Sequence, residues 1–317
     1  MKILITGGSG FIGTNMVEYY REKGFDIVSI DRREPKIPSH KDLWVKCDVT
    51  NYQALREAVR RFAPDFIVNM AAKTELDGKT LHDYDASITG VENILKIASE
   101  LKSLKKLLIT SSMLVCHRGY VPKGQHDYTP TTLYGESKVK AEELVWKYRP
   151  KCDWAILRPT SIWGPWFGTP YRNFFDVVKA RRYVHTGHKA CTKTYGYIDN
   201  AIYQIDRILF TPTTDEDNKV FYIGDMPPVN IEEWANEIAG ELGYTIPRIP
   251  YWVMRIAALF GDLMASVGIR FPMTSFRLKN MTTDNIMPLE NTMAIAPDLP
   301  VDRLTGVKRT LEWMVRT

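Results

Sequence analysis

The first thirteen residues, MKILITGGSGFIG, constrain the fold more than any other stretch of the chain. The apolar run over 3–5 predicts a buried strand, and the turn after it, with Gly7, Gly10 and Gly13, leads into a helical pattern that ends near Gly24. Glycines let a backbone turn tightly and approach a ligand, while a helix N-terminus offers free N–H groups and a positive dipole end. A strand, a glycine turn and a helix in this order predict a site for a dinucleotide pyrophosphate, although the spacing is GxxGxxG rather than GxGxxG.

An acidic residue follows the next strand pattern. The stretch 26–30 predicts a strand that ends at Asp31, about 20 residues beyond the glycines. A carboxylate there accepts hydrogen bonds from the adenosine ribose hydroxyls. Arg32 and Arg33 are able to receive the 2′-phosphate of NADP, whereas Asp31 repels it. The sequence therefore favours NAD as the cofactor and leaves NADP open.

Strands and helices alternate through the first 158 residues. Further strands are predicted at 43–47, 65–70, 107–110 and 154–157, and helices at 51–62, 81–102 and 133–147. This rhythm predicts an α/β fold, a Rossmann-type doubly wound parallel sheet with helices on both faces. Ligands bind such sheets at the carboxyl ends of the strands, where Asp48 and Ser112 also fall.

The regular alternation of strands and helices ends after residue 158. Helical patterns cover 174–180, 200–209, 231–242, 250–267 and 304–315, with strand-like runs at 194–198 and 220–223. We expect residues 1–158 to form the dinucleotide-binding domain and 159–317 a smaller, mostly helical substrate-binding cap. Segments near 194–224 are expected to return to the main sheet.

The catalytic candidates lie on the helix predicted at 133–147. Tyr134 and Lys138 are four residues apart and share one helix face. A nearby ammonium group stabilises a phenolate, so we expect the pKa of Tyr134 to fall toward neutrality and the phenol to exchange a proton with an alcohol or carbonyl. Ser112, at the end of the strand 107–110, is expected to hydrogen-bond the reacting oxygen.

Taken together, these motifs resemble the extended short-chain dehydrogenase/reductases. More narrowly, they resemble the NAD-dependent epimerase/dehydratase family that acts on nucleotide sugars, including 4-epimerases of the UDP-glucose/UDP-galactose type. The resemblance spans nearly the whole chain and rests on TGGSGFIG, Asp31, Asp48-Val49, Ala71-Ala72, Ser111-Ser112, Tyr134xxxLys138, Arg158-Pro159 and Trp163-Gly164-Pro165.

The resemblance implies a role for each matching residue. The catalytic set would be Ser112, Tyr134 and Lys138. The cofactor would be held by Gly7, Gly10, Phe11, Ile12, Gly13, Asp31, Arg32, Asp48, Val49, Ala71, Ala72, Lys138 and Pro159. The substrate would contact Lys73, Ser112, Arg172, Asn173, Lys193 and Arg277. Lys193 would replace a phosphate-binding arginine, keeping the charge but losing the bidentate fork. No metal is expected.

The reaction expected from this resemblance is epimerisation of a nucleotide-diphosphate sugar through a transient keto sugar, with Tyr134 as the acid and base. A one-way keto-sugar reductase or dehydrogenase would use the same residues. A dehydratase is less favoured, because Met113-Leu114 follow Ser112 where dehydratases carry an acidic residue. A non-catalytic dinucleotide-binding regulator is also less favoured, and whether Cys116 or His117 takes part in the chemistry stays open.

Composition bounds the partners and the location. The formal net charge of +5 is spread along the chain without a basic tail, so no nucleic-acid partner is expected. The apolar stretch 252–267 is too short to span a bilayer, and no membrane partner is expected. Four scattered cysteines and the absence of a signal-peptide pattern predict a cytoplasmic protein. The family resemblance implies a homodimer through the helices at 81–102 and 133–147.

Overall fold

A parallel β-sheet forms the centre of the molecule. The computed structural model describes residues 1–169, 171–187, 191–213, 215–266, 268–269 and 271–316. In these residues, seven strands pair in the order β10-β6-β5-β4-β1-β2-β3, and every pairing is parallel. The strands are β1 (Lys2–Thr6), β2 (Asp26–Asp31), β3 (Trp44–Lys46), β4 (Phe66–Asn69), β5 (Lys106–Thr110), β6 (Asp153–Pro159) and β10 (Val220–Ile223).

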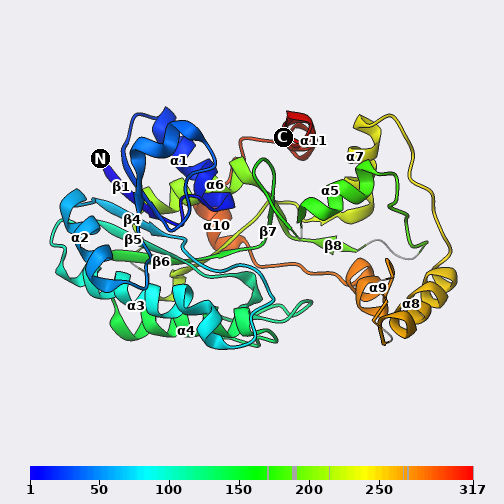
Figure 1. Cartoon of the computed structure of the whole chain (residues 1–317), viewed down its shortest axis with the longest axis horizontal. Coiled ribbons are helices and arrows are strands. Elements are labelled where there is room, and N and C mark those ends of the chain that lie inside the picture. The colour runs from blue at the N-terminus through cyan, green and yellow to red at the C-terminus, as the bar shows by residue number, and fades with distance from the viewer. Residues whose placement is uncertain (170, 188–190, 214, 267, 270, 317) are drawn as a thin grey trace.

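Helices cover both faces of this sheet, which confirms the predicted doubly wound α/β class. Helices α1 and α6 lie on one face, and α2, α3 and α4 on the other (Figure 1). Their side chains and alternate strand residues form two apolar layers, one around Ile5 and Val68 and the other around Leu4 and Ile67. These helices are α1 (Phe11–Glu22), α2 (Tyr52–Phe62), α3 (Asp85–Glu100), α4 (Leu133–Tyr148) and α6 (Ile198–Phe210).

The remaining elements build the cap. Two small sheets pair β7 with β9 and β8 with β11. The strands are β7 (Ser161–Trp163), β8 (Thr192–Lys193), β9 (Tyr195–Tyr197) and β11 (Val229–Asn230). The helices are α5 (Tyr171–Lys179), α7 (Ile231–Glu241), α8 (Tyr251–Ser266), α9 (Ser275–Thr282), α10 (Glu290–Ile295) and α11 (Arg303–Arg316). Helices α8 and α9 lie at the end of the molecule farthest from the sheet (Figure 1).

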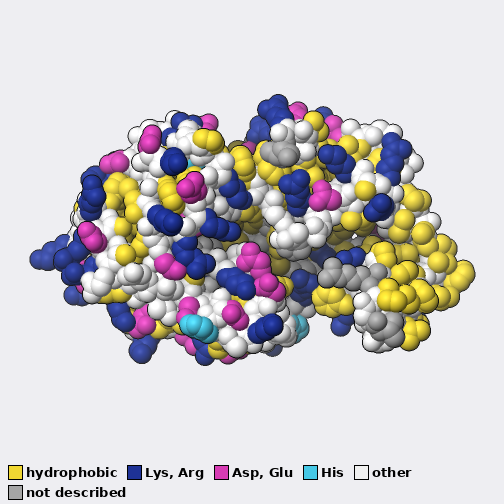
Figure 2. Space-filling view, viewed as in Figure 1, with side chains coloured by type: hydrophobic (Ala, Val, Ile, Leu, Met, Phe, Trp, Pro, Cys, Tyr) yellow, Lys and Arg dark blue, Asp and Glu magenta, His cyan; other side chains and the backbone are white. Residues whose placement is uncertain are grey.

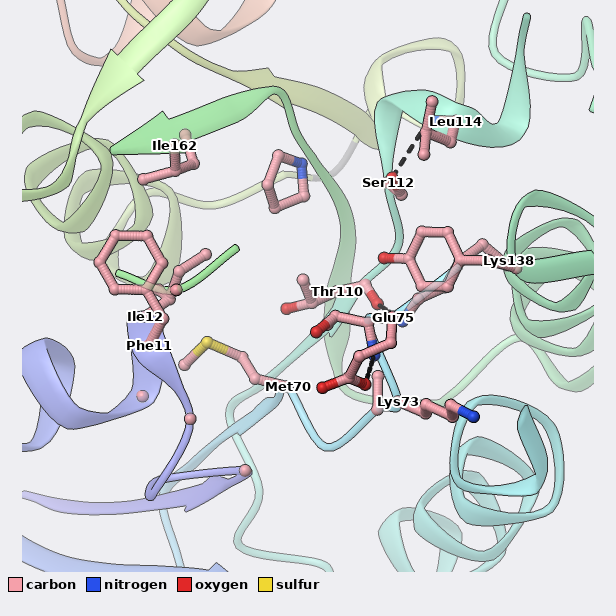
Figure 3. A pocket seen from close by; sticks show the side chains of 18 of the residues that line it. Phe11, Ile12, Met70, Lys73, Glu75, Thr110, Ser112, Leu114, Lys138 and Ile162 are labelled. Carbon is pink, nitrogen blue, oxygen red and sulfur yellow. Dashed lines mark hydrogen bonds between the residues drawn. The ribbon is translucent and has the colours of Figure 1, made fainter. Parts of the chain in front are cut away.

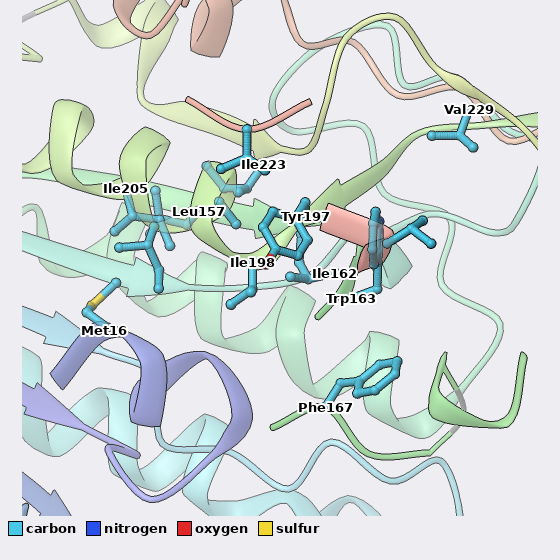
Figure 4. Close-up of a cluster of buried hydrophobic side chains, with 14 of the residues drawn as sticks. Met16, Leu157, Ile162, Trp163, Phe167, Tyr197, Ile198, Ile205, Ile223 and Val229 are labelled. Atoms are coloured by element: carbon cyan, nitrogen blue, oxygen red, sulfur yellow. The ribbon is translucent and has the colours of Figure 1, made fainter. Parts of the chain in front are cut away.

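The chain passes back from the cap to the sheet. Strand β10 pairs with β6, with Phe221 opposite Leu157, while the strand predicted at 194–198 pairs instead with β7 as β9. The junction between the two halves is apolar: Met16 of α1, Leu157 and Trp163 belong to one continuous buried cluster (Figure 4). The sheet and the cap therefore share a core.

Most predicted elements lie within a few residues of the observed ones, with several differences. The helix predicted at 81–102 begins as a 3₁₀ turn (Leu81–Tyr84) before α3. Strands β7, β8 and β11 and helices α9 and α10 have no counterpart in the sequence prediction. In the described part of the chain, no helix is long and apolar enough to cross a membrane.

Candidate active site

A cleft of about 1120 Å³ opens at the carboxyl ends of the sheet strands. The parallel arrangement carries residues from distant positions of the sequence to this edge. Gly7 follows β1, Asp31 ends β2, Asp48 follows β3, Ala71 follows β4 and Ser112 follows β5. All five line the cleft. The structure thus brings together residues that the sequence analysis singled out one strand at a time.

The glycine turn forms a cradle that fits a pyrophosphate. Gly7 has a φ of +75°, which a side chain rarely tolerates, and a Cβ on Gly13 would lie 2.2 Å from the Gly7 carbonyl oxygen. Gly10 caps α1 without a side-chain hydrogen bond to the first turn of the helix. The N-terminus of α1, which begins with Phe11 and Ile12, is therefore open to an anion. All these residues line the cleft.

Asp31 and Arg32 define the edge of the cleft beyond β2. The Asp31 carboxylate accepts hydrogen bonds from the backbone N–H groups of Ser9 at 3.1 Å and Arg33 at 2.9 Å. These bonds hold the carboxylate beside the glycine turn. The Arg32 guanidinium lies 3.3 Å from the Asp48 carboxylate. An arginine paired with an acid is less available for a 2′-phosphate, so this geometry agrees with NAD rather than NADP.

The next wall of the cleft is made by Asp48, Val49, Ala71 and Ala72. The Asp48 carboxylate also accepts hydrogen bonds from the backbone N–H and the hydroxyl of Thr50 at 2.9 and 2.8 Å. A Cβ on Gly90 of α3 would lie 2.6 Å from Val49, so the absence of a side chain there lets α3 approach this wall. Pro159, at the end of β6, lines the cleft as well.

Tyr134 and Lys138 reach the cleft from the first turns of α4. Thr132 caps this helix by accepting a hydrogen bond from the Gly135 N–H at 3.0 Å. The Lys138 Nζ donates to the Thr110 carbonyl at 2.9 Å and lies 5.9 Å from the centroid of the Tyr134 ring. Ser112 Oγ accepts a hydrogen bond from the Leu114 N–H at 3.1 Å (Figure 3).

The pKa of Tyr134 differs from the sequence expectation. Burial raises the pKa of Tyr134 to about 12, and a hydrogen bond with Ser112 acts in the opposite direction. Burial also lowers the pKa of Lys138 to about 8. The expected fall of the Tyr134 pKa toward neutrality is wrong for this geometry, because the ammonium group is directed to the Thr110 carbonyl and its charge does not offset the burial of the phenol.

The structure brings only some of the substrate candidates to the cleft. Lys73, Ser112 and Lys193 line it. The described residues Arg172, Asn173 and Arg277 do not. Arg172 lies 3.8 Å from the Asp176 carboxylate, Asn173 is exposed on α5, and Arg277 donates to the Pro272 carbonyl at 2.5 Å. Sequence order alone does not specify which way a helical side chain of the cap points.

Several cleft residues were not predicted from the sequence, among them Arg118 and Glu75. Arg118 lies on the loop after β5 and lines the cleft without an ion pair to any described residue. Glu75 projects into the cleft from the loop after β4 (Figure 3), and its charge contributes to raising the pKa of Tyr134, after burial. Their positions in the sequence could have indicated this, since Glu75 follows β4 and Arg118 follows β5, and both strands end at the cleft. Cys116 and His117 lie on the same loop as Arg118 but do not line the cleft among the described residues.

The parallel sheet, the glycine cradle and the Tyr134–Lys138 pair define an extended short-chain dehydrogenase/reductase. The chain belongs to the NAD dependent epimerase/dehydratase family, whose model matches residues 3–224. The cofactor of the family is NAD, and the glycine cradle and Asp31 fit it.

Individual relatives span several reactions. The chain is 28% identical over 266 residues to a 3β-hydroxysteroid dehydrogenase/Δ5→4-isomerase of Mycobacterium tuberculosis, covering 78% of this chain and 71% of that protein. It is 25% identical over 321 residues to an N-acetyl-α-D-glucosaminyl-diphospho-ditrans,octacis-undecaprenol 4-epimerase of Escherichia coli O157:H7, covering 98% and 95%. The structure of a UDP-glucuronic acid 4-epimerase from Bacillus cereus with NAD has a TM-score of 0.76 at 17% identity and covers 100% of this chain and 97% of its own.

Proposed function

We propose that the protein is an NAD-dependent epimerase that inverts C4 of a sugar diphosphate through a transient keto sugar. The observation that carries this proposal is the meeting of Tyr134, Lys138 and Ser112 in one cleft with the glycine cradle and Asp31. The length of the match to the Escherichia coli 4-epimerase supports the same reaction.

In this mechanism Tyr134 holds and moves the proton. NAD held by the glycine turn and Asp31 would supply reversible hydride transfer. With a pKa of about 12 the phenol is protonated near neutral pH, so its action as a base would require a phenolate favoured by the positive charges of Lys138 and of bound, oxidised NAD. As a phenolate, Tyr134 would accept the proton of the sugar hydroxyl during oxidation, and as a phenol it would donate the proton back during reduction, with Ser112 orienting the same oxygen. The cleft walls keep the reacting groups out of bulk water, since Tyr134 is buried. Inversion requires the keto sugar to rotate between the two half-reactions, so that its opposite face receives the hydride.

Lys138 has two tasks in this proposal. Its ammonium group would steady the phenolate electrostatically and hydrogen-bond the nicotinamide ribose, as the family resemblance implies. Because burial lowers the Lys138 pKa to about 8, the charged form predominates below that pH. Gly7, Gly10 and Gly13 would hold the pyrophosphate of the cofactor, and Asp31 its adenosine ribose.

The substrate we propose is a sugar joined to a diphosphate, and the carrier that the family resemblance implies is a nucleoside. Lys193 and Arg118 supply positive charge in the cleft, which supports binding of an anionic group. Lys73 is held at the same cleft by an ion pair with Asp77 at 2.9 Å. The Escherichia coli relative is named for a sugar diphosphate carried on undecaprenol. Nucleoside and lipid carriers share the sugar diphosphate that these cations would bind.

We further propose a homodimer in which α3 and α4 of each subunit form a four-helix bundle, the arrangement implied by the family resemblance. The two helices already pack against each other within one subunit. Tyr148 of α4 donates to Glu92 of α3 at 2.8 Å, and Lys96 lies 3.0 Å from the same carboxylate. Light scattering of the purified protein measures the assembly directly.

We assign the protein to the cytoplasm as a proposal. Its four cysteines, Cys47, Cys116, Cys152 and Cys191, are all free thiols. Free thiols are usual in a reducing compartment.

The experiment that tests the proposed reaction identifies the nucleotide that the denatured, purified protein releases. An epimerase returns its hydride to the substrate in each cycle, so near-stoichiometric NAD should be carried through purification and detected by mass spectrometry. A one-way reductase or dehydrogenase, the alternative supported by the mycobacterial relative, must exchange its cofactor. An empty protein that binds NADPH from solution would contradict the epimerase proposal and support the reductase.

A further inference from the structure

The end of the cap carries an exposed apolar surface. Large apolar side chains cover it, with exposed fractions such as 66% for Trp252, 64% for Leu263 and 68% for Phe276. We call this surface the α8–α9 face. It comprises Trp252, Ile256, Leu259, Phe260, Leu263, Ile269 and Phe276. Figure 2 shows hydrophobic side chains gathered over this end of the molecule.

The exposed apolar residues of α8 form a stripe on the side of the helix opposite the buried one. Trp252, Ile256, Leu259 and Leu263 follow a helical period on one side of α8. The opposite side is the one that packs: Met254 and Ala258 belong to a small core with Leu278 of α9. Helices on a protein surface normally turn polar residues outward. A contiguous apolar surface of this kind marks a site of contact with a partner or a membrane.

The charges around the face have one dominant sign. Among the described residues of 251–281, the basic side chains are Arg255, Arg277 and Lys279, and the acidic one is Asp262. The Asp262 carboxylate accepts a hydrogen bond from the Ser275 N–H at 3.1 Å, which engages it within the helix pair. Basic residues beside an apolar helix face are typical of helices that lie in the interface of an anionic membrane.

We propose that the α8–α9 face docks on the surface of an anionic lipid bilayer. The apolar stripe would enter the boundary between headgroups and acyl chains, and the basic side chains would meet lipid phosphates. A tryptophan at one end suits this boundary because its ring is apolar and its N–H is polar. In a symmetric contact with a second copy, the basic surplus would face itself, which disfavours that occupant. The inference departs from the sequence expectation of no membrane partner.

The docked face borders the cleft. Phe276 and Asn280 are four residues apart on α9 and therefore share one side of that helix. Phe276 belongs to the apolar face, whereas Asn280 lines the cleft and its backbone carbonyl accepts a hydrogen bond from Lys193 Nζ at 2.6 Å. The Lys193 contact therefore lies about one turn of α9 from a residue of the apolar face. Resting on the proposed function, this continuity favours a sugar diphosphate carried on a lipid.

Vesicle sedimentation tests the docking without any turnover. The wild-type protein should bind vesicles of equal parts phosphatidylglycerol and phosphatidylcholine, and added salt should weaken the binding. The double variant Leu259→Gln/Leu263→Gln replaces two apolar side chains that are 62% and 64% exposed, and its vesicle affinity should fall by at least about tenfold. Val315→Gln on α11 is the matched control, because Val315 is 77% exposed outside the face.

Each other outcome overturns the docking proposal. It fails if the wild type does not sediment with the vesicles, or if the double variant binds them as well as the Val315→Gln control does. A double variant that loses self-association, in a protein that does not bind vesicles, would identify a second copy of the chain as the occupant. Circular dichroism confirms that the variants are folded.

A second measurement tests the carrier of the substrate. Wild type and double variant are compared on UDP-N-acetylglucosamine in solution and on polyprenyl-diphosphate-linked N-acetylglucosamine in the same vesicles. The lipid-linked substrate should be turned over at least about tenfold more slowly by the double variant, with the soluble substrate unaffected. Equal rates on the lipid-linked substrate would overturn the lipid carrier. Vesicle binding without wild-type activity on either substrate would reject the proposed function alone.

Discussion

The sheet edge and the α8–α9 end of the cap follow opposite rules. At the sheet edge, polar side chains have partners fixed by the strands, as with Lys138 on the Thr110 carbonyl. At the α8–α9 end, apolar side chains such as Leu263 point outward. Strand geometry thus forces a few residues to meet, and their chemistry can be inferred from sequence order. Where helices pack only on each other, sequence order does not reveal which side they bury.

The largest effect expected from this comparison is at Tyr134. Replacing Tyr134 with Phe removes the proton-transferring hydroxyl while keeping the ring that packs against Tyr84. Turnover should fall by about 10²- to 10⁴-fold. Cofactor binding, measured by fluorescence or calorimetry, should persist because the cradle is untouched. Turnover close to that of the wild type would show that the sheet edge does not carry the chemistry in the way we infer.

A smaller effect is expected at Asp225, which follows β10 and contacts β9 and α6. Its carboxylate accepts hydrogen bonds from the Tyr197 N–H at 2.9 Å and Asn200 Nδ2 at 3.1 Å. Burial raises the pKa of Asp225 to about 7. Between about pH 4 and about pH 7, the Asp225 carboxyl is therefore protonated in the folded protein but ionised in the unfolded chain. The free energy of unfolding consequently decreases as the pH rises through this range.

Urea unfolding of the wild type and Asp225→Asn tests this titration. Between about pH 5 and about pH 8, the free energy of unfolding of the wild type should fall by about 2 to 3 kcal/mol more than that of the variant. The Asn variant cannot ionise and serves as its own reference at each pH. The same pH dependence in both proteins would mean that Asp225 is already ionised in the folded state at low pH.

The smallest expected effect is a change in substrate affinity that distinguishes Arg118 in the cleft from arginines of the outer cap. Arg118→Ala should weaken binding of a sugar diphosphate by about tenfold, as expected for a charge-assisted hydrogen bond. Arg172→Ala and Arg277→Ala are matched controls, because these side chains do not line the cleft among the described residues. They should leave the affinity almost unchanged. A larger loss at Arg277 than at Arg118, measured by titration calorimetry, would mean that the cap moves inward over the substrate.

The same contrast explains how much could be predicted. The doubly wound sheet and the meeting of Gly7, Asp31 and Ser112 could be inferred because parallel strands bring their carboxyl ends to one edge. Arg118 was missed because its loop has no periodicity. That loop is held by long-range contacts, such as the hydrogen bond from the Gly119 N–H to the Asn285 side chain.

The depth at which a side chain is buried could not be predicted from the sequence either. The pKa of Tyr134 was expected to fall and instead rises to about 12, because the spacing of Tyr134 and Lys138 does not reveal how deeply the phenol lies. Helix α9 was missed for a related reason. It is only eight residues long, and Leu278 is its one fully buried position, so it lacks the repeated apolar signal of a longer helix.

The return of β10 to the sheet has a consequence for how this chain can be divided. A fragment that stops at residue 158 would still contain the glycine cradle and Tyr134. It would lack the strand that hydrogen-bonds to β6, and it would leave Ile156 and Leu157 on an open sheet edge. It would also lack α6, which packs against α1 and against the strands β5, β6 and β10. The cofactor-binding half is therefore encoded in two separate pieces of the chain, and neither a truncation nor a domain swap at a single point would transfer it whole.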